Sequence, residues 1–387
     1  MRAKLSELGT VITGNTPSKQ ESKYWASSDI PFIKPDAINQ DGIQELQTAN
    51  EYISEAARSK ARIVGKSVVL VTCIGTIGKI CLTGKECAFN QQINAIIPND
   101  RVLPEYLAYC LYYNRPKLIE LANAPVVPII NKRQFEDFSV NIEENVEQQG
   151  SIVTILKKVD RLIHYRQQQL QKLDDLVKAR FVELFGDPKM NPHNYPLCQL
   201  SDYIVFLTSG SRGWAQYCVD DGTEWFITIK NVKDCHILTD NMQSINAPNN
   251  VEAKRTRVQE GDLLISITAD LGRTGVVMKE IAEHGAYINQ HLTCVRLKQD
   301  ALNPLYAAYF MESPAGKEQF ESKNQSAVKA GLNFNSINSL RLIVPPLDEQ
   351  NAFVDFIKQT DKSKAVIQKA LDEAHLLLDS LMQRYLE

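Results

Sequence analysis

The sequence predicts a mixed α+β protein built from two tandem, pseudo-symmetric α/β modules, each followed by a long helix. Segments of the first half return in the second half at a spacing of about 200 residues, far longer than the roughly 20–50 residues of solenoid repeats. In each half, short strand patterns are followed by a long stretch with helical periodicity. Because the period is of domain size, each copy is expected to be a whole domain with an attached helix.

Four pairs of segments carry the repeat. They are LSELGTVITGNTPS (5–18) with LSDYIVFLTSGSRG (200–213), FNQQIN (89–94) with INQHLT (288–293), PEYLAYCL (104–111) with PLYAAYFM (304–311), and VEQQGSIV (146–153) with DEQNAFVD (348–355). Many positions differ between the copies. One fold used twice with changed side chains is expected of a protein that reads two different things.

Each module is expected to begin with strands and to continue with a helix. The strands are predicted at 30–35, 67–73 and 94–97 in the first module, and at 225–229, 262–268 and 291–297 in the second, bounded by Gly, Pro and Asn. Helices are predicted at Pro104–Tyr113 and Pro304–Met311, where proline suits the first helical turn. The modules are therefore mixed α+β.

The first long helix is predicted from about Glu143 to Phe185, a length of about 60 Å at 1.5 Å per residue. It should end at Gly186-Asp187-Pro188, where Gly suits the C-terminal cap and Pro prevents continuation. Its apolar stripe is predicted to consist of Ile152, Ile155, Val159, Leu162, Leu173 and Leu176. The predicted domains are 1–141 (first module), 142–187 (central helix), 188–344 (second module) and 345–387 (C-terminal helix).

The second long helix should open after Pro345-Pro346 and run to the C-terminus. Its stripe is predicted to be Ile367, Ala370, Ala374, Leu377, Leu381 and Tyr385. Two long helices with one apolar stripe each are expected to pair as an antiparallel coiled coil. The alternative is that each helix packs on its own module alone.

The composition is that of a soluble globular protein. The chain has 387 residues, of which 44% are hydrophobic. Its net charge is -3 and its pI is 6.1, so the overall charge does not indicate a nucleic-acid-binding protein. No apolar run is long enough for a membrane span, and no signal peptide is expected. We therefore expect a cytoplasmic protein with no membrane association, and any affinity for DNA would have to come from local patches.

Neither the cysteines nor the known catalytic motifs indicate an active site. The eight cysteines form no CxxC pair and no cluster with histidines, so we expect reduced thiols and no metal site. The sequence contains no GxxxxGK[ST], GxSxG or HExxH motif. The glycine pairs at 75–78 and 272–275 are better interpreted as tight turns than as nucleotide cradles. The sequence predicts no catalytic residue.

Two modules of one design, each followed by a long helix and lacking a catalytic motif, resemble the specificity (S) subunit of type I DNA restriction–modification enzymes. The resemblance covers essentially the whole chain. It is carried by the 5–18 opening, IPFIKPDAI (30–38), the glycine turn at 75–78, FNQQIN, and the helix end FVELFGDP (181–188). One departure is that Ile142-Glu143-Glu144-Asn145 lacks the proline pair that precedes the second long helix.

The resemblance implies a non-catalytic subunit of a multisubunit adenine-DNA methyltransferase/endonuclease. Each module would be a target recognition domain that reads one half of a bipartite, asymmetric sequence in double-stranded DNA. The helices would set the spacing and dock methylation (M) subunits, two of them in our prediction. Those subunits would bind S-adenosylmethionine, and restriction (R) subunits would use ATP and Mg; this chain itself would hold no cofactor.

Candidate DNA contacts are side chains that grip phosphates or present donors and acceptors to base edges. They are Thr16, Ser18, Lys19, Lys34, Lys79, Asn131, Lys132 and Arg133 in the first module, and Ser211, Arg212, Lys230, Lys254, Arg255, Arg273, Asn333 and Asn335 in the second. Lys34 in IPFIKP is aligned with Lys230 in FITIK, and these two are the preferred phosphate contacts because the positive charge is present in both copies. Positions that differ between the copies are the preferred base-reading candidates, and Arg133 with its counterpart Asn335 is the example.

Each kind of candidate residue also has a purely structural role open to it. Asn90-Gln91 and Asn289-Gln290 are also the amides expected to tie loops to the backbone, the loop hydroxyls are also turn residues, and loop cations are commonly only solvated. Three rival functions remain open at this point: a protein-binding tandem adaptor spaced by a coiled coil, an S-like subunit serving a fused methyltransferase–nuclease, and an enzyme of unknown type.

Overall fold

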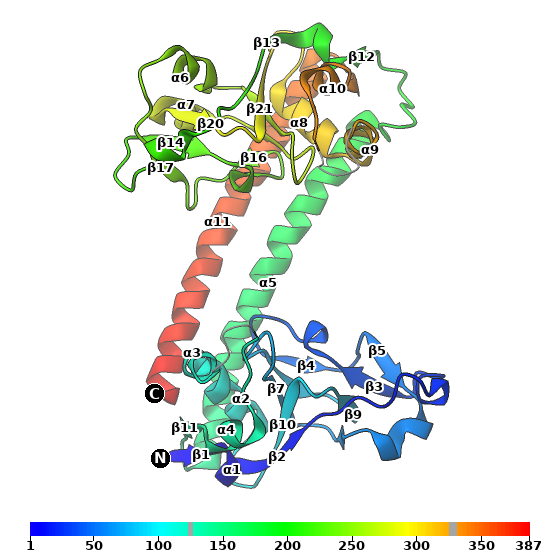
Figure 1. Cartoon of the computed structure of the whole chain (residues 1–387), viewed down its shortest axis with the longest axis vertical. Helices are drawn as coiled ribbons and strands as arrows, with labels where there is room; N and C mark the ends of the chain where they lie inside the picture. Colours follow the sequence, from blue (N-terminus) through cyan, green and yellow to red (C-terminus); the bar gives the residue numbers. More distant parts are fainter. Residues whose placement is uncertain (123–126, 325–330) are drawn as a thin grey trace. The chain divides into compact units, whose positions relative to one another are not determined.

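The structure is a computed structural model that describes residues 1–122, 127–324 and 331–387 (Figure 1). The chain divides into two compact units, and each is described by itself. Unit 1 contains residues 1–169 and 367–387, and unit 2 contains residues 170–366. Each unit is therefore one module together with a segment of each long helix.

Unit 1 has two main sheets and a small strand pair. Its helices are α1 (Leu5–Leu8), α2 (Pro104–Tyr113), α3 (Arg115–Glu120) and α4 (Lys132–Asp137). Its strands are β1 (Arg2–Lys4), β2 (Gly9–Thr13), β3 (Ile30–Ile33), β4 (Gln44–Leu46), β5 (Glu51–Ile53), β6 (Ile63–Val64), β7 (Val69–Thr72), β8 (Ile80–Thr83), β9 (Cys87–Phe89), β10 (Ile93–Pro98) and β11 (Ser139–Asn141). The sheet orders are β2-β10-β7-β8-β4, β5-β3-β9-β6 and β1-β11.

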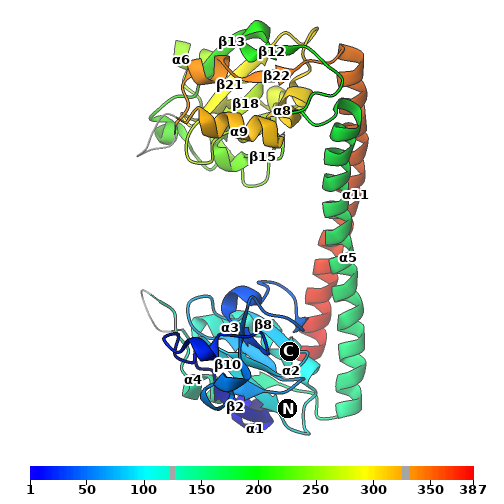
Figure 2. The same cartoon turned by 90° about the vertical axis from the view of Figure 1, so that its right-hand side faces the viewer.

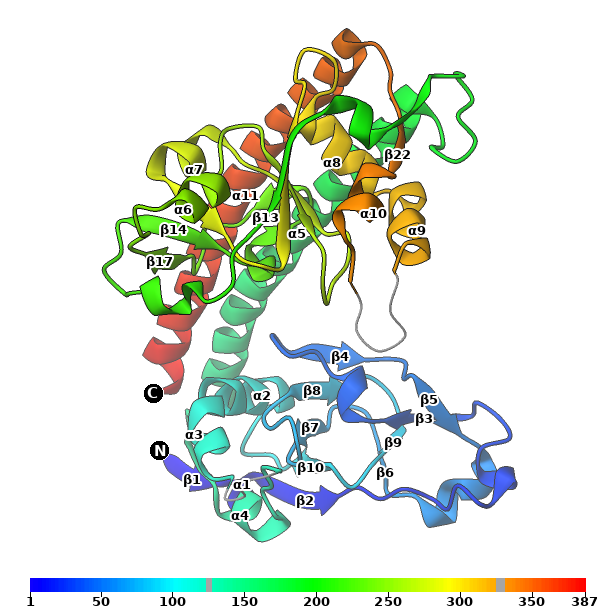
Figure 3. The same ribbon diagram turned by 45° about the horizontal axis from the view of Figure 1, so that its top comes forward.

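The β-rich part of unit 1 is held by an apolar core between its two main sheets. The strands in the centre of the larger sheet are visible in Figure 3 beside α2. Leu70 and Ile93 from that sheet pack in one cluster with Ile33 and Phe89 from the other. The sequence of a strand that is buried on both faces is a nearly continuous apolar run. The strands predicted at 67–73 and 94–97 were recognised for this reason, and they correspond to β7 and β10.

Unit 2 repeats most of this topology, with four strands in its larger sheet and three in the other. Its helices are α6 (Val251–Thr256), α7 (Lys279–His284), α8 (Pro304–Glu312), α9 (Pro314–Ser322) and α10 (Phe334–Asn338). Its strands are β12 (Leu197–Gln199), β13 (Ile204–Ser209), β14 (Glu224–Ile227), β15 (Val232–Lys233), β16 (His236–Ile237), β17 (Gln243–Ile245), β18 (Leu263–Ser266), β19 (Thr274–Val276), β20 (Ala286–Ile288), β21 (Leu292–Leu297) and β22 (Arg341–Ile343). The orders are β13-β21-β18-β19, β17-β14-β20, β15-β16 and β12-β22.

The match between the units extends to strand direction. The parallel pair β3 and β9 of unit 1 corresponds to the parallel pair β14 and β20 of unit 2, and unit 1 has a second parallel pair, β4 with β8. The sheet order β2-β10-β7-β8 corresponds to β13-β21-β18-β19. The predicted α+β class and the duplication are therefore confirmed.

The long helices are α5 (Val146–Phe185) and α11 (Leu347–Leu386), of 40 residues each. In unit 1 the end of the chain lies beside the start of α5, because the Asn141 side chain donates to the carbonyl of Glu387. In unit 2 the rings of Phe181 and Phe185, near the end of α5, contact Phe353 near the start of α11. The predicted antiparallel pairing is thus present in each unit (Figures 1 and 2).

The first residue of α5 and both buried stripes differ from the prediction. Helix α5 begins at Val146 rather than near Glu143, because the Asn145 side chain caps it by accepting from the amides of Glu147 and Gln148. The buried apolar side chains are Ile152, Val153, Leu156, Val159, Ile163, Val177, Phe181 and Phe185 in α5, and Phe353, Val354, Ile357, Leu371, Ala374, Leu378, Met382 and Leu386 in α11. Of the predicted members, Ile155, Leu162, Leu176 and Leu377 are exposed, and Leu173, Ile367, Ala370, Leu381 and Tyr385 are only half-buried.

A buried glutamine fixes the start of each long helix. Gln149 accepts from the amide of Leu103 at 2.8 Å and donates to the carbonyls of Arg101 and Glu143. Gln350 makes the corresponding three bonds, to the amide of Asn303 and to the carbonyls of Ala301 and Pro345. Gln149 is thus equivalent to Gln350, which shifts the VEQQ/DEQN pairing read from the sequence by one residue.

All eight cysteines lie in the described part of the chain and are free thiols. Burial raises the pKa of Cys73, Cys87 and Cys110 to about 12. These thiols therefore remain protonated at neutral pH and behave as small apolar groups.

In unit 2, a histidine joins β16 to α11. The ring of His236 contacts a carboxylate oxygen of Asp361 at 3.0 Å through Nε2 and the carbonyl of Asp234 at 2.7 Å through Nδ1. Burial by itself would lower the pKa of His236, but the hydrogen bond and the charge of Asp361, aided by the Asp234 carbonyl, raise it above its ordinary value. Lys364 and Asp174 lie in the same cluster and form an ion pair at 2.6 Å.

Because the folded pKa of His236 is raised, its contribution to stability should be complete below the ordinary histidine pKa of about 6.5. It should be lost as pH rises through the raised folded value. We therefore expect the free energy of unfolding of unit 2 to fall from pH 6 to pH 8, and His236→Gln to remove most of that fall. Urea denaturation at a series of pH values measures this change in the free energy of unfolding. His164→Gln, at an exposed position in unit 1, is the control, and an unchanged pH profile in His236→Gln would contradict the assignment.

Candidate nucleic-acid interface

Four loops meet at one end of the larger sheet in each unit, and we call this region the loop end. In unit 1 it is formed by residues 14–20, 73–79, 90–92 and 127–131. In unit 2 it is formed by residues 210–213, 267–273, 289–291 and 331–333. The loops meet because β2 and β7 end where β10 begins, with Thr13 opposite Asn94 and Thr72 opposite Ile93.

The same backbone hydrogen bonds tie the loops together in both units. The pairs of equivalent bonds are Gly14 N to Ile93 O with Gly210 N to Leu292 O, Cys73 N to Gln92 O with Ile267 N to His291 O, and Ile130 N to Cys73 O with Leu332 N to Ile267 O. All six are between 2.7 and 3.1 Å long. The loop ends therefore share one backbone frame, and these bonds define which residues are equivalent.

A glycine and an asparagine close the centre of each frame. A Cβ at Gly14 would collide with the carbonyl of Asn90, and one at Gly210 with the carbonyl of Asn289. The side-chain oxygens of Asn90 and Asn289 accept from the amides two residues later, each at 3.1 Å. The interpretation of these asparagines as amides that tie a loop to its backbone is confirmed.

Lys34 and Lys230 do not occupy equivalent positions, which corrects the alignment read from the sequence. The amides of Asn90 and Asn289 donate to Ile33 and Ile227, respectively, so the residue that follows Ile33 corresponds to Thr228, and Lys230 corresponds to Asp36. Lys34 is bound by Glu51, which raises the pKa of the lysine through their hydrogen bond. Lys230 is exposed. The argument from a shared charge therefore fails for this pair.

Lys79 and Arg273 are equivalent, because their amides make the same bond to the strand before the turn. Lys79 N donates to the hydroxyl of Thr72, and Arg273 N to the hydroxyl of Ser266. Gly272 thus matches Gly78, whereas Gly275 lies within β19. The ammonium of Lys79 donates to two backbone carbonyls at 3.0 Å, and Arg273 pairs with Asp270, so both cations have partners inside their own module.

Asn131 and Asn333 are the N-cap residues of α4 and α10. Their side-chain oxygens accept from Gln134 N and Ser336 N, each at 2.9 Å. Two residues farther on, Arg133 and Asn335 are exposed and equivalent, as the sequence predicted. Lys132, between Asn131 and Arg133, pairs with Glu136 at 3.4 Å.

The remaining candidates of unit 1 lie on the first loop, after β2. The hydroxyl of Thr16 donates to the side-chain oxygen of Gln91 at 2.7 Å. Ser18 and Lys19 are exposed. The ammonium of Lys19 lies 5.4 Å from the centre of the Trp25 ring and 3.8 Å from Glu51.

The remaining candidates of unit 2 gather around the turn after β13. Ser211 is buried, whereas Arg212 is exposed. Arg255, on α6, donates to the hydroxyl of Thr208 and, at 2.9 Å, to the carbonyl of Ser209. Lys254 is exposed and lines a separate cavity of about 340 Å³.

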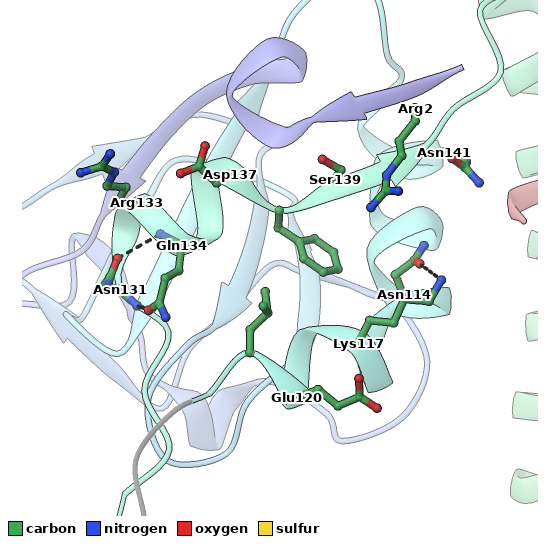
Figure 4. A pocket seen from close by; sticks show the side chains of 12 residues that line it. Arg2, Asn114, Lys117, Glu120, Asn131, Arg133, Gln134, Asp137, Ser139 and Asn141 are labelled. Carbon is green, nitrogen blue, oxygen red and sulfur yellow. Dashed lines mark hydrogen bonds between the residues drawn. The ribbon is translucent and has the colours of Figure 1, made fainter.

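An open pocket of about 970 Å³ lies beside the loop end of unit 1 (Figure 4). Asn131, the N-cap of α4, and Arg133 within α4 line it, together with Arg2 and Lys117. Figure 4 shows Asn131 and Gln134 in the reciprocal contact that caps α4. The pocket therefore surrounds two predicted contact residues with polar side chains that include both cations and the carboxylates Glu120 and Asp137.

Gln91 and Gln290 were given only a structural role from the sequence, and neither they nor His291 were among the predicted DNA contacts. Gln91 binds Thr16 in unit 1, and in unit 2 the ring of His291 contacts the Thr268 hydroxyl at 2.7 Å and the Gln290 amide at 3.2 Å. The recurrence of FNQQIN as INQHLT was the available signal. Only the backbone frame shows that these side chains lie at the centre of the loop end.

The described ranges contain neither a candidate metal site nor a candidate membrane span. No group of three or more His, Cys, Asp or Glu side chains there is arranged to hold a metal ion. No helix in those ranges is both long and apolar enough to cross a membrane.

Comparison with known proteins gives a consistent result over most of the chain. The family model described as the type I restriction modification DNA specificity domain matches residues 1–174 and 221–375. The StySPI specificity subunit of Salmonella potsdam is 22% identical over 99% of this chain and 87% of that protein. The HindI specificity subunit of Haemophilus influenzae is 41% identical, over 27% of this chain and 22% of that protein.

The fold comparison agrees with the sequence comparison. The crystal structure of the type I restriction–modification S subunit from M. genitalium matches with a TM-score of 0.60 at 12% identity, covering 100% of this chain and 96% of that one. At this identity the likeness concerns the fold alone. The chain spans less than half the length of several curated relatives that it matches locally, at 22%, 43% and 48%. Because the family model matches both halves and most of its length, the chain belongs to the type I restriction–modification DNA specificity family.

Proposed function

We propose that this chain is the non-catalytic DNA-specificity subunit of a type I restriction–modification complex. Each loop end reads one half of a bipartite, asymmetric target in double-stranded DNA. The observation that carries the proposal is one backbone frame used twice with different exposed side chains, such as Arg133 against Asn335. A shared frame supplies a common way to approach a duplex, and the changed side chains supply two different readings.

Methylation subunits, two per chain, are the proposed partners of the long helices, which set the spacing between the half-sites. This part of the proposal is supported by large apolar side chains that remain exposed on α5 and α11, including Ile155, Leu162, Leu176, Val366 and Leu376. Large apolar side chains that remain exposed can mark a surface that a partner covers. S-adenosylmethionine would bind to those methylation subunits, and restriction subunits would use ATP and Mg. A complex that acts on cellular DNA would reside in the cytoplasm.

The test is to map methylated adenines across the host genome with the gene present, deleted and restored. We expect deletion to abolish one bipartite motif with an unspecified gap of fixed length, and restoration to return it. Restoration with Arg133→Asn should alter or abolish recognition in one half of the motif only. Asn335→Arg, at the equivalent position of unit 2, should affect the other half.

Native mass spectrometry of the complex purified through this chain should find two methylation subunits for each copy of it. A methylome that does not change on deletion, in a host that expresses the gene and its partners, would refute the proposed function. The protein-binding adaptor would then become the preferred function.

A further inference from the structure

The turn after β13 in unit 2 holds a polar atom that the folded chain leaves unused. Ser211 is 5% exposed, and its hydroxyl oxygen is buried with no hydrogen-bond partner in the described part of the chain. A buried hydroxyl without a partner destabilises the fold, so most such groups in native proteins are satisfied. Its retention in this turn therefore suggests that a partner arrives from outside.

The equivalent turn of unit 1 is satisfied internally. Asn15 follows Gly14 as Ser211 follows Gly210, and the glycines are equivalent through their bonds to β10 and β21. The Asn15 side chain donates to the carbonyl of Lys60 at 2.6 Å and accepts from the amide of Arg62 at 2.6 Å. In unit 1 the side chain at this position is therefore hydrogen-bonded to the backbone of its own unit, whereas in unit 2 the Ser211 hydroxyl has no partner in the described residues.

A guanidinium is held against the turn in unit 2 and not in unit 1. Arg255 donates to the Thr208 hydroxyl and the Ser209 carbonyl through one nitrogen, while its other terminal nitrogen is 3.9 Å from Glu252. The strand pairing places Ala61 at the position of Arg255, because Ile63 and Arg257 pair with the equivalent residues Ala88 and Tyr287.

A second cation stands on the turn itself. Arg212 is exposed, directly follows Ser211, and forms no ion pair with any residue that the structure describes. The hydroxyl, the Arg255 guanidinium and Arg212 together supply the donors of a phosphate contact, and none of them is an acceptor-only group. Backbone phosphates accept such hydrogen bonds from arginine and serine, and most protein–DNA hydrogen bonds go to the phosphates and sugars.

We propose that the turn formed by residues 208–212 of unit 2, with Arg255, binds a DNA backbone phosphate, and that unit 1 makes no such contact at its equivalent turn. This proposal rests on the proposed function, since it assigns one contact within it. The contact positions unit 2 on the duplex without reading sequence.

Salt dependence of binding tests the charge. The assembled complex, carrying wild-type or variant full-length chain, is titrated by fluorescence anisotropy against two duplexes, one with the bipartite motif found by methylation mapping and one with both half-sites scrambled. Loss of one phosphate contact lowers the slope of log affinity against log salt by about one. We expect this for Arg255→Gln on both duplexes, and a retained slope for Arg255→Lys.

Arg257→Gln is the matched control, because it removes the same charge two residues away, where Arg257 faces Glu224 at 3.5 Å. It should leave the slope unchanged. An unchanged slope in Arg255→Gln would overturn the inference while wild-type binding to the motif upholds the proposed function. A loss confined to the motif duplex would also overturn it, because that result indicates base reading. A wild-type complex that prefers neither duplex would refute the proposed function instead.

Ser211→Ala tests the hydroxyl through two readouts of opposite sign. The variant should raise the thermal midpoint of the free complex by a degree or two, because an unsatisfied buried group is removed, and should weaken binding to both duplexes by roughly three- to tenfold. Asn15→Ala, the counterpart in unit 1, should lower the midpoint and leave DNA affinity unchanged. If Ser211→Ala lowers the midpoint or leaves binding intact, the hydroxyl has no role in the contact.

Discussion

Phe185→Ala should lower the free energy of unfolding of unit 2 by about 3–5 kcal/mol, the range typical of a buried phenylalanine truncation. The ring of Phe185 is 0% exposed at the end of α5. It lies 5.0 Å from the ring of Tyr306 and 5.6 Å from that of Phe353, measured between centroids. The truncation therefore opens a cavity where α5, α8 and α11 meet, and large rings on three elements cannot easily close it.

Urea denaturation followed by tryptophan fluorescence measures this loss selectively. Trp214 and Trp225 belong to unit 2 and Trp25 to unit 1, so a Trp25→Phe background reports on unit 2. Val182→Ala is the control, because Val182 lies on the same helix but is 52% exposed and should cost well under 1 kcal/mol. Equal losses in the two variants would show that Phe185 is not a member of the core.

The elements that the sequence located best are those with a long periodic pattern. Helix α11 begins at Leu347, directly after Pro345-Pro346, and α5 ends at Phe185 before Gly186, which has a φ of +72°. Proline and a glycine in the left-handed region stop helices for local reasons that need no knowledge of the fold. The start of α5 was placed too early because Asn145, and not the acidic residues before it, is the cap.

The faces of the long helices were harder to assign. Apolar residues stand side by side at Ile155-Leu156 and at Leu376-Leu377-Leu378, so two neighbouring stripes satisfy the same spacing. Burial selects Leu156 and Leu378, because the contacts of the folded unit decide between adjacent stripes. Periodicity alone gives the width of an apolar face more reliably than its centre.

The matching of residues between the two loop ends was also correct where a local role fixed the position and wrong where none did. Asn131 and Asn333 were matched correctly because each is an N-cap, a local role with a strong residue preference. Lys34 and Lys230 were mismatched because identical letters were aligned across an irregular segment, where no periodicity fixes the register. The bonds from Asn90 to Ile33 and from Asn289 to Ile227 provide that register, and they involve backbone atoms that the sequence does not reveal.

Arg296→Met should destabilise unit 2 by about 3–5 kcal/mol, since it leaves a buried carboxylate without its cation. Asp262 is 0% exposed and binds Arg296 through two nitrogens, at 2.7 and 2.8 Å. The same carboxylate accepts from the amide of Gln259 at 2.7 Å. One remaining backbone donor is not enough to stabilise a carboxylate that water cannot reach.

Unit 1 supplies the matched rescue for this variant. Leu263 pairs with Val295 as Val69 pairs with Ile96, so Asp262 and Arg296 correspond to Val68 and Ile97, an apolar pair. Replacing a buried ion pair by apolar residues of suitable shape is often neutral or stabilising. The double variant Asp262→Val/Arg296→Ile should therefore recover most of the stability that Arg296→Met loses, as measured in the same urea assay.

Arg273→Met controls for the loss of one positive charge, because the Arg273–Asp270 pair is largely exposed and should contribute under about 1 kcal/mol. If the double variant is as unstable as Arg296→Met, the ion pair is required by its surroundings in unit 2 and the two modules are not interchangeable at this position. If the double variant recovers the stability, the cores of both units accept either an ion pair or an apolar pair at these two positions. The ion pair would then be a difference that accumulated at a framework position and has no bearing on what unit 2 reads.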